Sequence, residues 1–216
     1  MERWAAVVGV GGLGCPAAEV LAPAGVPLRL IDDDVVERSN LHRQTLFAEG
    51  DVGVAKVEAA RRALRSRFGV AAEAVRTHLV PENAVDLLAG ASVIVEGTDT
   101  LAVKFLASDV ARTLGIPVVH GACVGWHGTV LPVLPGRSAC YRCVFEDLPD
   151  DEMTNCAIAG VYGPLTSVLG ALMAADALRL REGDDATAGH LARYDGWSQS
   201  FRSTALARRR GCPCTP

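Results

Sequence analysis

Residues 4–14 read Trp-Ala-Ala-Val-Val-Gly-Val-Gly-Gly-Leu-Gly, an apolar run that ends in the pattern G-x-G-x-x-G at Gly9, Gly11 and Gly14. A second apolar run ends at Ile31 and is followed by three aspartates, 32–34. In a strand–helix–strand unit of this kind, glycines let the backbone approach a phosphate, a helix N-terminus faces that phosphate, and the acid after the second strand binds a ribose. The stretch therefore predicts a Rossmann-type nucleotide-binding sheet.

Two cations follow this unit and argue against a dehydrogenase. Arg43 lies in the run Ser-Asn-Leu-His-Arg-Gln (39–44), and Lys56 ends the run Asp-Val-Gly-Val-Ala-Lys (51–56). Elsewhere both would be interpreted as surface charges, but here their loops follow the nucleotide-binding strand. A cation pair is not needed to hold a nicotinamide for hydride transfer, whereas it is needed to hold and break a triphosphate.

The composition indicates a globular protein without the excess of positive charge that is typical of nucleic-acid binding. The 216 residues are 50% hydrophobic and 21% charged, with a net charge of −4, and a chain of this length builds one sizeable core. The first residues lack the basic region of a signal peptide, so we expect a cytoplasmic protein. Residues 153–175 carry no charge and are long enough to span a bilayer, but Pro164 and two glycines interrupt them. We expect instead a loop that leads into a buried helix, 164–181, and no contact with a membrane.

Strands alternate with helices through the first half of the chain and then stop alternating. This order predicts an α/β fold: a Rossmann-like, mostly parallel sheet with helices on both faces, antiparallel C-terminal strands and a zinc knuckle. We expect a single domain, 1–216, with a nucleotide-binding half, 1–121, and a half, 122–216, that holds the antiparallel strands. The expected strands are 4–8, 27–32, about 70–75, 92–96, 117–120, 128–134, 191–194 and 201–206, the last three around helix 164–181; the other expected helices are 15–22, 38–44 (one short turn), 56–67, 83–88 and 100–113.

Four of the seven cysteines form two close pairs. Cys140 and Cys143 make a C-x-x-C knuckle, and Cys212 and Cys214 make a C-x-C pair that begins 69 residues after Cys143. One pair alone would also fit a redox motif, but four thiolates from two pairs favour a tetrahedral structural zinc site. Because C-x-C is tighter than the usual spacing, one ligand could come from elsewhere or the site could be impaired.

The remaining cysteines are single. Cys156 lies in the uncharged stretch before the helix, where it is either a small core residue or a nucleophile for an activated acyl group. Cys15 falls where the first helix packs under the glycine loop, and Cys123 follows a strand, so we expect both to be structural.

The acids divide by their position relative to the strands. Asp32 closes the second strand and is suited to accept two ribose hydroxyls, whereas Asp33 and Asp34 fit solvated turn residues. Asp99, in Gly-Thr-Asp-Thr (97–100), follows a buried strand at the edge where ligands bind. Its carboxylate is placed to hold a magnesium ion on phosphates, to cap the next helix, or to do both.

Together these segments resemble the ThiF/MoeB/HesA adenylyltransferases, prokaryotic relatives of the ubiquitin-activating enzymes. The resemblance runs from residue 4 to the C-terminus, and its motifs match in order as well as in content. The matching stretches are 9–18, 32–47, 51–56, 97–100, 140–143 and 160–165.

The resemblance implies a reaction, cofactors and partners. With ATP, Mg²⁺ and a zinc ion, these enzymes adenylate the C-terminal glycine of a small ubiquitin-like sulfur-carrier protein that ends in Gly-Gly, and they form homodimers. It implies a catalytic set of Arg43, Lys56, Asp99 and Cys156, the last as the cysteine that links covalently to the carrier in some members. It assigns the nucleotide to Gly9, Gly11, Gly12, Gly14, Asp32, Asp34, Asn40, Arg43, Lys56 and Asp99, and the zinc to Cys140, Cys143, Cys212 and Cys214. It also implies that the half 122–216 binds the carrier.

Three differences from the family pattern leave alternatives open. The chain begins close to its first strand, whereas members carry a preceding segment with an arginine that reaches the neighbouring subunit's nucleotide. Thr100 replaces the usual asparagine, and the tail reads C-P-C instead of C-P-x-C. The alternatives are adenylation of a peptide or another carboxylate, and a nucleotide-binding partner with reduced turnover. An NAD-dependent oxidoreductase leaves Arg43, Lys56 and the cysteine pairs unexplained.

Overall fold

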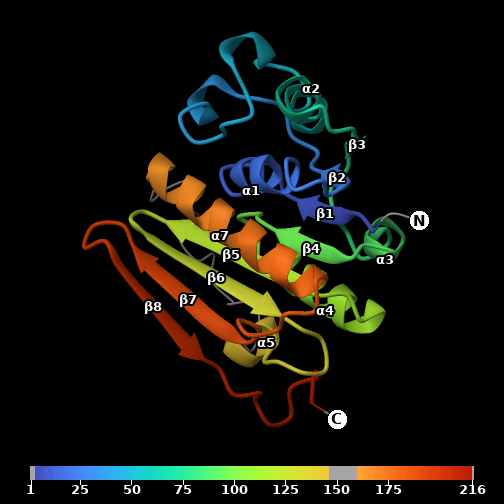
Figure 1. Ribbon diagram of the computed structural model, residues 1–216, viewed down its shortest axis with the longest axis vertical. Helices are drawn as coiled ribbons and strands as arrows, with labels where there is room; N and C mark the ends of the chain where they lie inside the picture. The colour runs from blue at the N-terminus through green and yellow to red at the C-terminus, as the bar shows by residue number, and fades with distance from the viewer. Residues whose placement is uncertain (1–2, 146–159, 216) are drawn as a thin grey trace.

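A computed structural model describes residues 3–145 and 160–215 of the chain, and its centre is one mixed sheet (Figure 1). Among these residues the strand order is β3-β2-β1-β4-β5-β6-β7-β8. The first five strands in that order, β3, β2, β1, β4 and β5, pair in parallel. Strands β6, β7 and β8 extend the sheet with antiparallel pairings. The strands are β1 (Ala5–Val8), β2 (Leu28–Ile31), β3 (Ala72–Val75), β4 (Val93–Glu96), β5 (Val118–Val124), β6 (His127–Val133), β7 (His190–Asp195) and β8 (Ser200–Ala205).

Helices cover both faces of the sheet, as the sequence predicts. Helices α1 (Gly14–Leu21), α2 (Lys56–Phe68) and α7 (Gly163–Arg181) share one hydrophobic core with the sheet. Helices α3 (Ala84–Leu88), α4 (Leu101–Leu114) and α5 (Tyr141–Val144) share the other. Two single 3-10 turns, η1 (Arg38–Asn40) and η2 (Glu49–Asp51), lie in the connection between β2 and α2.

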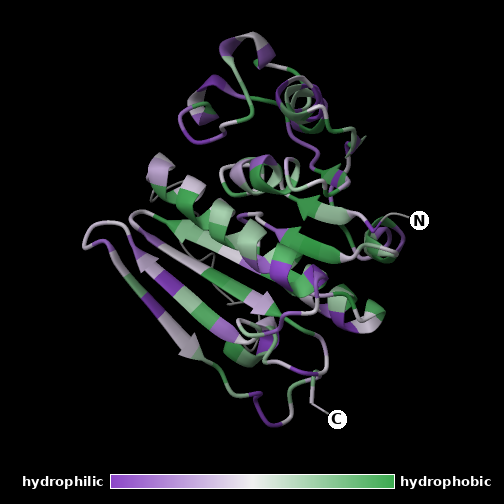
Figure 2. Ribbon diagram, in the orientation of Figure 1, coloured by the Kyte–Doolittle hydropathy of each residue, from purple (hydrophilic) through white to green (hydrophobic). Residues whose placement is uncertain are grey.

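The central strands are apolar because both of their faces are covered. All four residues of β1 and all four of β4 are buried, and Figure 2 shows β1 as a hydrophobic ribbon between the helices. Helices α2 and α4 both end at glycines in the left-handed conformation, Gly69 and Gly115, which residues with a side chain rarely adopt. These local signals explain why most element boundaries agree with the sequence within one or two residues.

The long helix α7 confirms the expectation of a buried helix near 164–181. It packs against α1 and lies across β4, β5 and β6. Pro164 occupies its first turn, where a backbone N–H would have no acceptor within the helix, so the missing N–H of proline costs no hydrogen bond. No helix within 3–145 or 160–215 is long and apolar enough to cross a membrane.

Two expectations need correction, and one helix was not predicted. The C-terminal strands do not surround α7; they extend the sheet beyond β5 and leave α7 on one face. Strand β5 continues to Val124 because its residues pair with β6 across a tight turn at Gly125, whose φ is +57°, so Cys123 lies within a strand and does not follow one. Helix α5, which carries the first cysteine knuckle, was not expected.

Candidate nucleotide-binding site and cysteine cluster

The glycine loop lies where the strand order reverses. Strand β1 sits between β2 and β4, and the loop leaves its carboxyl end between the ends of those two neighbours. The backbone N–H of Gly9 donates to Ile31 O (2.9 Å), and that of Gly97 donates to Val8 O (2.9 Å). Ligands of open α/β sheets bind at this position, so the sequence and the topology indicate the same edge.

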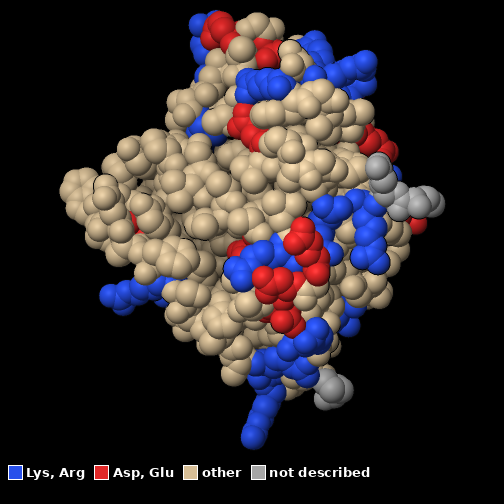
Figure 3. All heavy atoms as spheres, viewed as in Figure 1, with Lys and Arg blue, Asp and Glu red and all other residues tan. Residues whose placement is uncertain are grey.

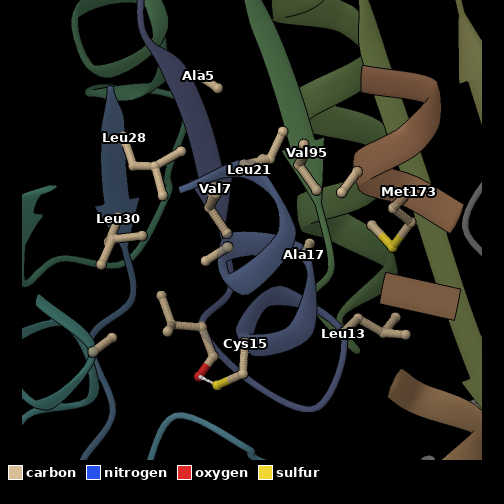
Figure 4. Packing of buried hydrophobic residues seen from close by; sticks show 14 of the residues in the cluster. Ala5, Val7, Leu13, Cys15, Ala17, Leu21, Leu28, Leu30, Val95 and Met173 are labelled. Carbon is tan, nitrogen blue, oxygen red and sulfur yellow. Dashed lines mark hydrogen bonds between the residues drawn. The ribbon is translucent and has the colours of Figure 1, made fainter. Parts of the chain in front are cut away.

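Close packing explains two of the glycines. Gly9 has φ +83°, and a Cβ on Gly14 would lie 1.9 Å from Gly9 O. Helix α1 therefore starts directly against the loop, and Figure 4 shows Leu13, just before this helix, pointing toward α7 and Met173. Cys15 is fully buried, donates to Val10 O (3.6 Å), and has its pKa raised mainly by burial, which agrees with the expected structural role.

Asp32 joins the glycine loop to the end of β2. Its Oδ2 accepts the backbone N–H of Val10 (2.7 Å), and its Oδ1 accepts that of Asp34 (2.9 Å). Burial raises the pKa of Asp32, although the charge of Lys56 and these two hydrogen bonds act in the opposite direction. A carboxylate has about four acceptor positions, so Asp32 retains capacity for ribose hydroxyls.

Lys56 and Asp34 form an ion pair beside Asp32. Lys56 is the first residue of α2 and is buried, and its Nζ donates to Asp34 Oδ2 (2.7 Å). Burial alone would lower the pKa of Lys56, but the charges of Asp32 and Asp34 outweigh it and raise that pKa. The lysine is therefore a fixed positive charge next to the glycine loop, and Asp34, which is largely exposed, is not a purely solvated turn residue.

The loop 38–44 brings Arg43 to the same edge. The aliphatic part of Arg43 lies over Gly12, with Cγ and Cδ 3.5 Å from where a Cβ on Gly12 would stand. Its guanidinium approaches His42 Nε2 (3.4 Å), and Asn40 Nδ2 donates to Glu37 Oε2 (3.2 Å). The structure thus places Arg43 against the glycine loop and Asn40 in the preceding turn.

Asp99 lies on the neighbouring loop, after β4. It is exposed, and among the residues that the structure describes its carboxylate accepts one long hydrogen bond, from Thr100 Oγ1 (3.5 Å). The expectation that Asp99 caps the next helix is wrong, because Thr100 occupies the N-cap of α4 and makes no side-chain cap bond. The Asp99 oxygens are consequently available to a ligand.

Two features of this edge were not expected from the sequence. Gln44 is buried, with its Nε2 directed toward Gly11 and no partner for its Oε1 among the described residues. The position of Gln44 in the run 39–44 was a signal that could have identified it. Glu96, Lys104 and His120 form a buried ionic group behind the Asp99 loop, and no local pattern marks them.

The four paired cysteines gather in one cluster, which the N-terminal end of α5 and the C-terminal tail form together. The distances between sulfur atoms are 3.8 Å (Cys140–Cys143), 3.6 Å (Cys140–Cys212), 3.3 Å (Cys143–Cys214) and 3.4 Å (Cys212–Cys214). Sulfurs at about 2.3 Å from a tetrahedral zinc lie about 3.8 Å apart, so the cluster fits that ion closely. The tight C-x-C pair supplies both of its sulfurs, and no ligand from elsewhere is needed.

The surroundings of the cluster favour ionisation of one of its thiols. Burial opposes ionisation of Cys143, but the backbone N–H groups of Arg209 (3.4 Å to Sγ) and Cys140 help to lower the pKa of that thiol to about 7. Burial and the neighbouring sulfurs raise the pKa of Cys140, and they raise that of Cys214 to about 11. Cys156, the expected partner of the carrier, lies outside the described residues.

Comparisons with known proteins cover nearly the whole chain. A model of the ThiF family matches residues 3–214. The chain is 37% identical to the SAMP-activating enzyme E1 of Haloferax volcanii and 40% identical to the sulfur carrier protein adenylyltransferase of Thermus thermophilus, over 96% of its own length in both cases. The chain also shares its fold with Escherichia coli MccB, solved with AMPCPP and MccA, at a TM-score of 0.86 and 22% identity over 99% of the chain.

The chain is shorter than all of these proteins. It spans 78% of the Haloferax protein and 80% of the Thermus protein, but 66% of MccB. It spans 46% of the adenylyltransferase and sulfurtransferase MOCS3 of Drosophila sechellia, to which it is 40% identical.

Proposed function

The chain belongs to the ThiF family, and from this premise we propose that it adenylates the C-terminal glycine of a ubiquitin-like sulfur-carrier protein with ATP. The observation that carries the proposal is the assembly at one sheet edge of the glycine loop, Asp32, Arg43 and Lys56, in a chain 37–40% identical to enzymes named for this activity. In the reaction a carboxylate oxygen of the carrier attacks the α-phosphorus of ATP. The bond from that phosphorus to the pyrophosphate oxygen breaks, and pyrophosphate leaves.

Residues of different charge act on different parts of ATP. The glycine loop and the N-terminus of α1 receive the phosphates, and Asp32 holds the ribose. Arg43 and Lys56 neutralise the charge that develops on the phosphoryl oxygens. Lys56 is already held by Asp34 before any ligand binds, so little reorganisation is needed when the triphosphate arrives. The attacking carboxylate is ionised at neutral pH, and the step requires no general base.

The exposed carboxylate of Asp99 fits a magnesium ligand. It lies at the carboxyl edge of β4, and its oxygens make one long contact among the described residues. When held there by Asp99, Mg²⁺ would neutralise negative charge on the phosphates. The cysteine cluster fits zinc in a purely structural role, because it lies on the face of the sheet covered by α4 and α5.

The half 122–216 offers a surface for the carrier. Trp126 stacks on Tyr162 with ring centroids 4.0 Å apart and contacts Trp197 edge to face at 5.4 Å. Trp126 and Trp197 lie in the turns that follow β5 and β7, and Tyr162 is the N-cap of α7. Trp197 is 77% exposed, and Phe201 on β8 is exposed beside this turn. Aromatic side chains that stay in water on a monomer are typical of protein interfaces.

The outer face of α7 supports the expected homodimer. Val168 and Ala175 are exposed on it, with Leu172 partly buried between them, and Figure 3 shows few charges over this part of the surface. Apolar residues that gather on an exposed helix face are typical of a protein interface. A second copy of the chain would cover this face, and Val168→Glu should then yield a monomer by light scattering.

The test is ATP–pyrophosphate exchange in the presence of a purified carrier that ends in Gly-Gly. Arg43→Ala and Asp99→Ala should each lower the exchange rate by about 10²-fold or more, as removal of one transition-state contact does. Arg38→Ala is the matched control, because Arg38 lies in the same loop but pairs with Glu49 at the surface. Exchange that persists in both site variants would refute the assignment, and NAD binding without ATP binding would refute the class of enzyme.

A further inference from the structure

A buried ionic group lies behind the Asp99 loop, and the proposed reaction leaves it without a role. Glu96, the last residue of β4, is 0% exposed, and Lys104 on α4 and His120 on β5 are each 3% exposed. Lys104 Nζ donates to Glu96 Oε2 (2.9 Å) and to Gly121 O (2.6 Å). His120 Nδ1 lies 3.1 Å from the same Glu96 oxygen. Together the three side chains occupy the carboxyl end of the two central strands.

The group keeps Glu96 ionised. Burial alone would raise the pKa of Glu96, but the charge of Lys104 and hydrogen bonds from His120 and Thr98 lower it to about 2. Burial lowers the pKa of His120, so this ring is neutral and its Nδ1–H donates to the carboxylate. A buried ion pair is a weak source of stability, because desolvation of the two charges offsets most of their attraction. Stability alone therefore does not explain why these charges are buried at this end of the sheet.

The second oxygen of Glu96 holds the loop that carries Asp99. Glu96 Oε1 accepts both the backbone N–H (2.8 Å) and the hydroxyl (2.6 Å) of Thr98. Thr98 in turn packs on the glycine loop, because a Cβ on Gly9 would lie 2.8 Å from its methyl carbon and 3.0 Å from its backbone nitrogen. A charged oxygen on one side and the glycine loop on the other thus fix the residue directly before Asp99.

We propose that Glu96 is a positioning residue: it holds Thr98 against Gly9 and so aims the Asp99 carboxylate at the metal-bound phosphates. Lys104 and His120 hold Glu96 in that position. The inference rests on the proposed function, since it assigns to Asp99 the magnesium of the nucleotide. Glu96 thus sets the position of the Asp99 carboxylate, although the Glu96 side chain itself touches neither the metal nor ATP.

Two substitutions at Thr98 separate positioning from stability. Thr98→Val keeps the backbone N–H and a methyl group against Gly9 but removes the hydroxyl that Glu96 accepts. Thr98→Ser keeps the hydroxyl and removes the methyl group. Both variants leave Glu96, Lys104 and His120 in place, so the buried charges stay paired and folding is retained; the urea unfolding midpoint of each variant verifies this.

The readout is ATP binding by titration calorimetry across a series of Mg²⁺ concentrations, with EDTA as the zero point. Thr98→Val should raise the Mg²⁺ concentration that half-maximally tightens ATP binding by about tenfold, a loss in the range of one hydrogen bond to a charged group. In EDTA its ATP affinity should equal that of the wild type, and Thr98→Ser should stay within about twofold of the wild type throughout.

The outcomes separate this inference from the proposed function. If Mg²⁺ fails to tighten ATP binding in the wild-type protein, the role of Asp99 in the proposed function is wrong. If Mg²⁺ tightens binding equally in the wild type and Thr98→Val, the positioning role of Glu96 is overturned while the proposed function stands. An equal loss in EDTA and in Mg²⁺ also overturns it, because that pattern indicates general damage to the nucleotide site.

Discussion

Substitution of Gly14 by alanine tests the packing on which the nucleotide site depends. Gly14 begins α1, and an added Cβ would lie 1.9 Å from Gly9 O and 3.3 Å from Val7 Cγ1. Real Cβ atoms essentially never approach another atom within 3.0 Å, so helix and loop have to separate by about 1 Å. The loop has little freedom to yield, because Gly9 N is bonded to Ile31 O and Thr98 packs on its other side.

The expected effect follows from that displacement. Overpacking of this kind lowers the free energy of unfolding by about 1–3 kcal/mol. A loop that moves by about 1 Å also loses good geometry toward the phosphate, and one hydrogen bond to a charged group is worth about 1.5–3 kcal/mol. Gly14→Ala should therefore bind ATP about 10- to 100-fold more weakly than the wild type.

The assay combines ATP titration calorimetry with urea unfolding. Gly50→Ala is the control, since a Cβ there meets nothing within 4 Å and should change the free energy of unfolding by less than about 0.5 kcal/mol. ATP affinity within twofold of the wild type in Gly14→Ala, together with an unchanged unfolding midpoint, would show that close packing at Gly14 does not shape the site.

Four further predictions follow from other parts of the molecule. Cys140→Ser should lower the zinc content from about one ion per chain, measured by atomic emission on dialysed protein, whereas Cys123→Ala should keep it; full zinc in a Cys140→Ser/Cys212→Ser variant would refute the site. Acid should destabilise the fold. The folded protein lowers the pKa of His120, so the unfolded chain takes up this proton first as the pH falls below about 6.5. The pKa of Glu96 is lowered to about 2, so the stability from its charge is lost as the pH falls from about 4.5 toward 2. The urea midpoint should therefore fall with pH, and His120→Asn should flatten the slope just below about pH 6.5. Trp197→Ala should raise the carrier KM in the exchange assay about tenfold and leave ATP affinity unchanged, and a shift in ATP affinity alone would place the carrier elsewhere. Cys156→Ala should keep exchange and abolish a thiol-sensitive carrier adduct seen by intact mass, so loss of exchange in the folded variant would assign this cysteine to the first step.

The parts of the site that follow the chain locally could be predicted from the sequence. Gly9, Gly14 and Asp32 stand at fixed offsets from two apolar strands, and their geometry depends on those offsets. The paired cysteines are also local motifs, although the sequence left open whether Cys212 and Cys214 both reach the cluster.

Contacts between distant segments could not be predicted in the same way. The pairing of Lys56 with Asp34 spans 22 residues, and Glu96 meets His120 across 24 residues through the pairing of β4 with β5. A glutamate at the end of an apolar strand is typical of a strand boundary, so nothing in the sequence marks Glu96 as fully buried. No spacing rule relates such residues; the strand register brings them together.

The cysteine cluster also has a consequence for how the chain assembles. It joins Cys140 to Cys212 across 72 residues, a loop that contains α7, β7 and β8. Closing a loop of that length costs about 4 kcal/mol of chain entropy. The tail that carries Cys212 and Cys214 follows β8 in the chain, so a metal bound by all four thiolates would fasten the two outermost strands to the rest of the sheet. The rate at which a chelator removes that metal would then report how often the tail leaves the cluster.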